Sequence, residues 1–248
     1  DLAAIIVMAL PLAIMSFWES QYRSIALFLT LLFGGLGLEL IWWTKSRGAL
    51  LGLIVMLTVF FIIKVQNIRY RVMGVMAILL ISILAYNTVG SILQRSSSDL
   101  EESFQGRLNY IKAGLNMAVR NPIFGVGLGG FHRNFYQYSW DGTSGSKKGH
   151  TIHSTWFLIL CENGFPAFIL FMGILSISFK QAWRMRQAYP QYLLSLGAYA
   201  TCMSFLSHSY TLYPFILMAL IQSSYAVTNE QETTNFMISR AKYEVPYA

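Results

Sequence analysis

Residues 155–179 read TWFLILCENGFPAFILFMGILSISF and decide the fold class. The run is long and apolar enough to cross a lipid bilayer, which takes roughly 20 residues of helix. Its one charged side chain is Glu162. Gly164 and Pro166 follow closely, and such a pair is a common cause of a sharp bend in a helix. The sequence therefore predicts a membrane-spanning helix that is kinked or divided in two.

Other apolar runs of the same kind precede and follow this one. They cover residues 2–18, 24–43, 48–63, 72–86, 192–206 and 212–227. With residues 155–179 they make about seven candidate spans. We predict an all-α, polytopic transmembrane helix bundle. Its parts are N-terminal helices in residues 1–86, a partly helical external loop in residues 87–154, C-terminal helices in residues 155–227 and a cytoplasmic tail in residues 228–248.

The composition supports a membrane protein. Of 248 residues, 55% are hydrophobic and 12% are charged, whereas soluble domains average about 25% charged residues. The net charge of +7 resides largely in short loops between spans, which indicates membrane orientation and contact with lipid headgroups rather than nucleic-acid binding. Because the chain opens at Asp1 and runs straight into apolar residues, we expect the natural protein to begin earlier.

Basic residues set the expected orientation. Two short loops between spans carry Lys64, Arg69 and Arg71, and Lys180, Arg184 and Arg186, respectively. Basic loops favour the cytoplasmic side, and the order of spans places both loops on one side. The long loop of residues 87–154 is then external.

This external loop is too long to be a plain connection. Apolar residues at helical spacing predict an amphipathic helix that lies on the membrane surface or on the bundle, ended by Asn121 and Pro122. Its stripe consists of Leu108, Ile111, Leu115, Ala118 and Val119. Glycines from Gly125 to Gly130 follow, but no strand precedes them, so a dinucleotide loop is rejected. Close approach to a glycan or a helix explains them better, with Tyr136, Tyr138 and Trp140 as candidate sugar-stacking surfaces.

Lys45 and Arg47 break the charge pattern because they lie on the external side. Arg47 follows Ser46, a suitable helix N-cap, and a helix N-terminus with an arginine can bind an anion. Arg107 repeats the arrangement in the first turn of the amphipathic helix. Two such arginines suit a diphosphate. The alternatives are an arginine that reaches to lipid headgroups and a solvated surface charge.

His150 and His153 lie at the mouth of the span that contains Glu162. A neutral imidazole can act as a general base near neutral pH. Zinc binding would need further ligands and shows no HExxH spacing, so no metal is predicted. The candidates for those further ligands are His132, Asp141, Glu162 and His208. Glu162 is costly to bury in lipid, so it either binds substrate or makes a structural hydrogen bond.

Three pieces of the chain resemble the C-terminal signature of O-antigen ligases and O-antigen polymerases. They are Ser46-Arg47-Gly48 entering a span, Gly106-Arg107 with Pro122, Gly125, Gly127 and Phe131, and His153-Ser154 followed by nine residues and then Gly164. The third is the most specific match. Ala167 stands where the ligase motif has glycine, threonine or tyrosine, which leaves ligase and polymerase both open.

The resemblance implies a glycosyltransferase of the bacterial inner membrane, active at the periplasmic face. It implies transfer of an oligosaccharide from a polyprenyl diphosphate, such as undecaprenyl diphosphate, to a hydroxyl of a glycan, of lipid A core or of another acceptor. No metal or other cofactor is expected. On this likeness His153 is the base, Arg47 and Arg107 bind the diphosphate, and Lys45 and His150 assist.

Two other classes of function fit some of these residues. A transporter or flippase for a glycolipid would also carry Glu162 and external arginines, but transporters commonly show repeats and polar sites in mid-membrane. A noncatalytic subunit of a membrane assembly would keep the signature without turnover. The polar candidate residues lie at one face of the membrane, which favours a reaction at the membrane surface over transport.

Overall fold

The structure of the chain is a computed structural model that describes residues 2–18, 21–44, 46–92, 97–139, 152–207 and 210–243. Within these ranges helix is the regular secondary structure throughout, in agreement with the predicted all-α class. The first helices are α1 (Leu2–Trp18), α2 (Arg23–Thr44), α3 (Arg47–Lys64) and α4 (Ile68–Ile92). They are followed by α5 (Ser97–Arg120), α6 (Gly130–Tyr138), α7 (Thr155–Arg184), α8 (Pro190–Met203) and α9 (Tyr213–Tyr243).

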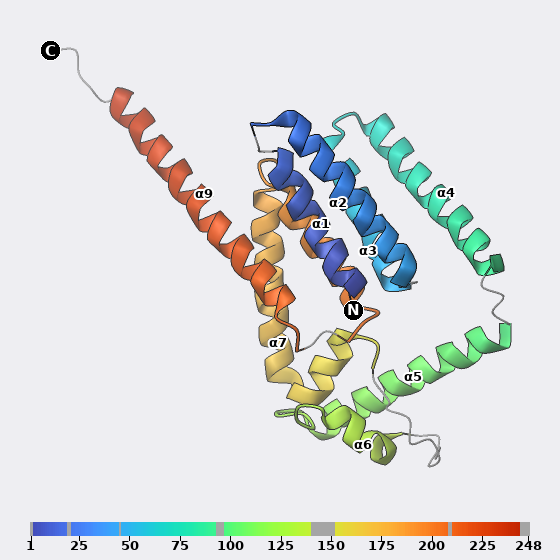
Figure 1. Ribbon diagram of the computed structural model, residues 1–248. Coiled ribbons are helices and arrows are strands. Elements are labelled where there is room, and N and C mark those ends of the chain that lie inside the picture. The colour runs from blue at the N-terminus through green and yellow to red at the C-terminus, as the bar shows by residue number, and fades with distance from the viewer. Residues whose placement is uncertain are drawn as a thin grey trace.

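The apolar helices run up and down side by side, and α5 and α6 lie across one end of the bundle (Figure 1). The α3–α4 and α7–α8 turns, which carry the two basic clusters, lie at the opposite end. The C-terminal part of α9 extends away from the bundle. The order of helices thus brings the starts of α3 and α7 to the end where α5 and α6 lie.

Two described helices, α2 and α7, are long and apolar enough to cross a membrane, and α1 and α3 contain shorter apolar helices. This supports a helical membrane protein, while the full set of about seven spans stays a prediction. The expected spans coincide with helices, although α4 continues past residue 86 to Ile92 and α9 past residue 227 to Tyr243. Beyond residues 86 and 227 the sequence is less apolar, so the two apolar runs end there although the helices continue.

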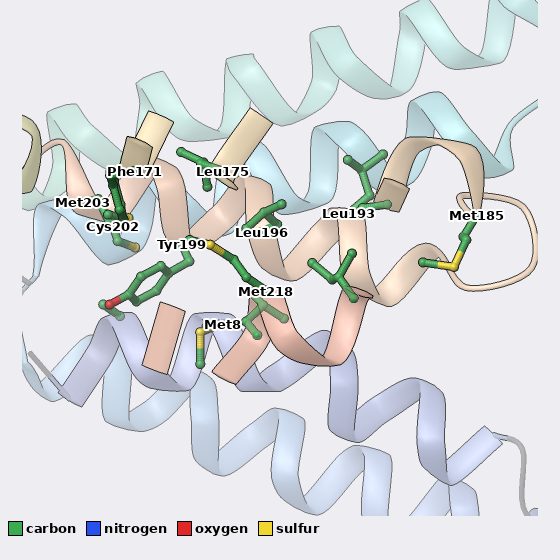
Figure 2. Close-up of a cluster of buried hydrophobic side chains, with 14 of the residues drawn as sticks. Met8, Phe171, Leu175, Met185, Leu193, Leu196, Tyr199, Cys202, Met203 and Met218 are labelled. Atoms are coloured by element: carbon green, nitrogen blue, oxygen red, sulfur yellow. The ribbon is translucent and has the colours of Figure 1, made fainter. Parts of the chain in front are cut away.

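The largest buried cluster joins α7, α8 and α9 with the start of the chain. Figure 2 shows Tyr199, Cys202 and Met203 of α8 among side chains from its neighbours, including Met8 and Met218. Tyr199 and Met203 are each 1% exposed, so the end of α8 is firmly anchored. A second cluster packs α5 and α6 against the first half of α7.

Helices α3 and α8 approach closely through glycine. A Cβ atom on Gly52 would lie 2.8 Å from Cys202 Sγ and 2.9 Å from the Ala198 carbonyl oxygen. Real side chains do not tolerate such contacts, so glycine permits this spacing. The start of α3 is therefore held against the end of α8.

The buried face of α5 differs from the expected apolar stripe. Ala113, Met117 and Ala118 are fully buried, whereas Leu115 is 41% exposed and Val119 is 69% exposed. A Cβ atom on Gly114 would lie 2.6 Å from Ile152 Cδ1. Gly114 lets α5 approach the segment before α7, so the face with Ala113, Met117 and Ala118 packs while Leu115 and Val119 point outward.

Helix α7 is kinked at Gly164, as the sequence predicts, and the α5–α6 turn (residues 121–129) fills the break. Gly164 has φ 78° and ψ 178°, a conformation essentially restricted to glycine. The Phe165 N–H donates to the Pro122 carbonyl at 2.8 Å. In return the Val126 and Gly127 N–H groups donate to the Cys161 and Glu162 carbonyls, each at 2.9 Å. The turn therefore satisfies the backbone groups that the kink releases.

Replacing Gly164 by alanine tests this junction. An added Cβ atom would lie 2.4 Å from the Ile123 carbonyl oxygen and would also strain the backbone. We expect Gly164→Ala to lower the free energy of unfolding by at least ~2 kcal/mol, measured by thermal unfolding in detergent. Gly173→Ala in the same helix is the control, because nothing lies within 4 Å of the position its Cβ would take. Equal stability of the two variants would contradict the tight junction.

Candidate active site

His153 lies in the short irregular segment that enters α7. His153 is exposed overall, although part of its surface is covered by protein, whereas Ile152 and Ser154 on either side are buried. Ser154 has extended backbone, with φ −163° and ψ 118°, and serves as the N-cap residue of α7. The buried neighbours fix the backbone while the imidazole remains accessible to a reactant.

Arg107 on α5 lies close enough to His153 for its charge to act on the imidazole. Partial burial first, and the positive charge of Arg107 second, lower the pKa of His153 from its ordinary value of 6.5. Arg107 precedes Gly114 by two helical turns and so shares the face of α5 that meets Ile152. The result is an exposed arginine beside an imidazole that stays neutral near pH 7 and can accept a proton.

Arg47 begins α3, and Ser46 caps that helix. The Ala49 N–H donates to Ser46 Oγ at 3.3 Å, as the predicted N-cap requires. The start of α3 lies at the end of the bundle where α5 and α6 lie (Figure 1). The described part of the chain gives the backbone of Arg47 but not its side chain, and Lys45 lies outside it.

Glu162 occupies a structural position inside the protein. Its side chain is 3% exposed. Its Oε1 accepts a hydrogen bond from the Phe131 N–H at 3.1 Å, and its Oε2 accepts one from the Tyr210 hydroxyl. Gly129, the N-cap residue of α6, has no side chain that could cap the helix, so the Glu162 carboxylate takes that place. Of the two roles that the sequence allowed, this arrangement fits the structural hydrogen bond rather than substrate binding.

The aromatic residues of α6 divide into two kinds. Tyr136 is 43% exposed and lies on the outer face of the helix. Tyr138 joins α6 to α5, because its hydroxyl accepts a hydrogen bond from Asn121 Nδ2 at 3.2 Å and the Arg120 guanidinium lies 5.6 Å from its ring centre. Tyr136 is thus better placed to stack on a sugar. Trp140 and His150, two further candidates, lie outside the described residues.

Metal ligands do not gather in the described part of the chain. Within it, no group of three or more His, Cys, Asp or Glu side chains could hold a metal ion. Asp141 and His208, which the sequence offered as further ligands, lie outside the described residues.

Three polar residues that the sequence did not single out form long-range hydrogen bonds at the start and in the first half of α7. Thr155 Oγ1 donates to the Leu206 carbonyl at 2.7 Å, Ser207 donates to the Ile152 carbonyl, and Tyr210 donates to Glu162. These bonds connect the α8–α9 region to α7 across about 50 residues of chain. Neither spacing nor residue type reveals such long-range partners.

The comparison with family models shows which protein family the chain belongs to. The model described as O-Antigen ligase matches residues 31–172, more than half of the chain. The chain belongs to the O-antigen ligase family. This confirms the resemblance predicted from the sequence motifs and places the chain in a membrane family of polysaccharide assembly. The match runs from α2 into α7 and includes Arg47, Arg107, His153 and Gly164. No curated protein matches the chain.

The effect of Arg107 on the pKa of His153 can be measured without substrate. Arg107→Gln removes a positive charge that disfavours the imidazolium, so the pKa of His153 should rise toward its ordinary value. The pH dependence of His153 carbethoxylation by diethyl pyrocarbonate, followed by peptide mass spectrometry, reports this pKa. Lys112→Gln, another exposed cation of α5, is the control and should leave the pKa unchanged. A His153 pKa that stays the same or falls in Arg107→Gln would show that the two groups do not interact.

Proposed function

We propose that this chain is a metal-independent glycosyltransferase that moves an oligosaccharide from a polyprenyl diphosphate carrier to an acceptor hydroxyl. The observation that carries the proposal is the pairing of His153, whose pKa is lowered, with the exposed Arg107 at the mouth of α7. Membership of the O-antigen ligase family supports the substrate class.

The chemistry follows from the two side chains. His153 accepts the proton of the acceptor hydroxyl as that oxygen attacks the anomeric carbon of the donor glycan. The bond from that carbon to the diphosphate oxygen breaks, and the polyprenyl diphosphate leaves with the electron pair. Arg107 stabilises the negative charge that develops on the leaving group. The products are the new glycoside and the carrier diphosphate.

Arg47 supplies the second diphosphate contact in this proposal. Its support is positional: Arg47 occupies the first turn of α3, where helix N–H groups and a guanidinium together favour an anion. The neighbouring Gly48 packs against Phe205, and the next residue of that segment, Leu206, accepts a hydrogen bond from Thr155. The start of α3 and the segment of His153 therefore share a neighbour.

The proposal also includes contacts with the glycan and an orientation in the membrane. Tyr136 offers an exposed ring for a sugar, and Lys45, His150, Tyr138 and Trp140 are auxiliary substrate contacts. The basic α3–α4 and α7–α8 turns lie at the end opposite α5 and α6, which supports a cytoplasmic position for those turns and a periplasmic active site in the inner membrane.

The direct test incubates purified protein with a polyprenyl diphosphate-linked glycan and separate candidate acceptors. Label that appears on lipid A core identifies a ligase, and label that appears only on growing repeat units identifies a polymerase. His153→Ala should lower the transfer rate about 10²- to 10⁴-fold while the protein remains folded and inserted. His132→Ala, an exposed histidine of α6, is the matched control and should transfer normally. Undiminished transfer by His153→Ala would remove the base assignment.

The arginines are tested by substitutions that keep their charge. Lysine cannot form the bidentate hydrogen bonds that arginine makes to two phosphate oxygens. Arg107→Lys and Arg47→Lys should therefore each lower kcat/KM for the donor about tenfold to a hundredfold. Arg133→Lys, on the outer face of α6, should leave kcat/KM unchanged. Wild-type kinetics in Arg47→Lys and Arg107→Lys would indicate that both arginines contact lipid headgroups rather than the donor.

A further inference from the structure

The end of α8 contacts two of the parts of the chain that carry proposed active-site residues, the start of α3 and the segment of His153. Residues 202–207, here called the α8 turn, close with the Ser204 N–H donating to Thr201 and the Phe205 N–H donating to Cys202, at 3.1 and 3.0 Å. Cys202 and Met203 are almost fully buried in the main cluster (Figure 2). The α8 turn therefore projects from a rigid base.

On one side the α8 turn contacts the start of α3. A Cβ atom on Gly48 would lie 3.0 Å from Phe205 Cβ, and Cys202 Sγ donates to the Gly48 carbonyl at 3.5 Å. Gly48 directly follows Arg47. The backbone from which Arg47 extends is thus packed against the α8 turn.

On the other side the α8 turn binds the segment that carries His153. Trp156 Nε1 donates to Ser204 Oγ at 3.0 Å, Thr155 Oγ1 donates to the Leu206 carbonyl at 2.7 Å, and Ser207 donates to the Ile152 carbonyl. These bonds flank His153 in the sequence on both sides. His153 itself has irregular backbone, so its position depends on how its neighbours are held.

We propose that the α8 turn is a positioning element that sets the place of His153 relative to Arg107 and the start of α3, with the Thr155–Leu206 and Ser207–Ile152 hydrogen bonds as its connections. The turn lies outside residues 31–172, so the family match does not cover it. The proposal rests on the proposed function for its kinetic consequence but not for its structural one. Because a misplacement of about 1 Å can cost a hundredfold in rate, these bonds should matter more for transfer than for folding.

Thr155→Val is the main test, because it keeps the shape of a buried side chain and removes its hydroxyl donor. We expect kcat for transfer to fall about tenfold to a hundredfold. Thr155→Ser restores the hydroxyl and should transfer within about threefold of the wild type on the same scale. Thr58→Val is the matched control, since that hydroxyl donates to Ile54 within α3, and it should behave as wild type. Ser207→Ala removes the second connection and should lower kcat in the same way.

A second readout needs no glycan donor. If His153 moves away from Arg107 and from its partly buried position, its pKa should rise in Thr155→Val and Ser207→Ala, as measured by carbethoxylation at His153. Thr155→Ser and Thr58→Val should titrate as wild type.

Two results would overturn the positioning role. One is unchanged His153 titration in both Thr155→Val and Ser207→Ala. The other is equal loss of transfer in Thr155→Ser and Thr155→Val. A wild-type protein that transfers no glycan counts against the proposed function alone, because the titration still decides the role of the α8 turn.

Discussion

The kink of α7 is the constraint on which the rest of this structure depends. Pro166 has no N–H, so an unbroken helix would leave the Glu162 carbonyl without its donor, and Gly164 turns the chain away at that point. The released groups exchange three backbone hydrogen bonds with the α5–α6 turn. Because the Glu162 side chain also caps α6 through Phe131, one short stretch of α7 holds both α5 and α6 in place. The part of the chain that carries Arg107 is thereby held against the segment that carries His153.

Glycine residues allow the neighbouring helices to pack closely against one another. Gly114 admits Ile152 against α5, and Gly48 and Gly52 admit the end of α8 against α3. A Cβ atom at any of these positions would lie 3.0 Å or less from its nearest neighbour, so in a closely packed interior the neighbouring atoms would have to move. The starts of α3 and α7 and the face of α5 that carries Arg107 are therefore set by close contacts of glycine backbone with Ile152, Phe205 and Cys202.

Sequence patterns predicted the helices and the local signals well. The first expected span coincides with α1, α7 begins at Thr155, and α5 ends at Arg120 before Asn121 and Pro122, because apolar length and helix-ending residues are local properties. The buried face of α5 and the helix α6 were not predicted. A periodic stripe shows which residues share a face, while the partner decides which face packs. Here Ile152 packs on the face of α5 that carries Gly114. Tyr210, which bonds to Glu162, and Leu206, which bonds to Thr155, each lie about 50 residues from their partners, so no local pattern identifies these pairs.

On the proposed function, the charge of Arg107 links donor binding to base strength. Without a ligand, partial burial of His153 and, in addition, the charge of Arg107 disfavour the imidazolium and lower the pKa of His153. A bound diphosphate brings negative charge to the arginine and offsets its field, so the imidazole gains affinity for a proton. His153 then becomes a stronger base in the complex that holds the activated glycan than in the empty site. Deprotonation of a hydroxyl is thereby favoured when a donor is present to receive the resulting nucleophile, and this coupling requires only that Arg107 and His153 remain neighbours.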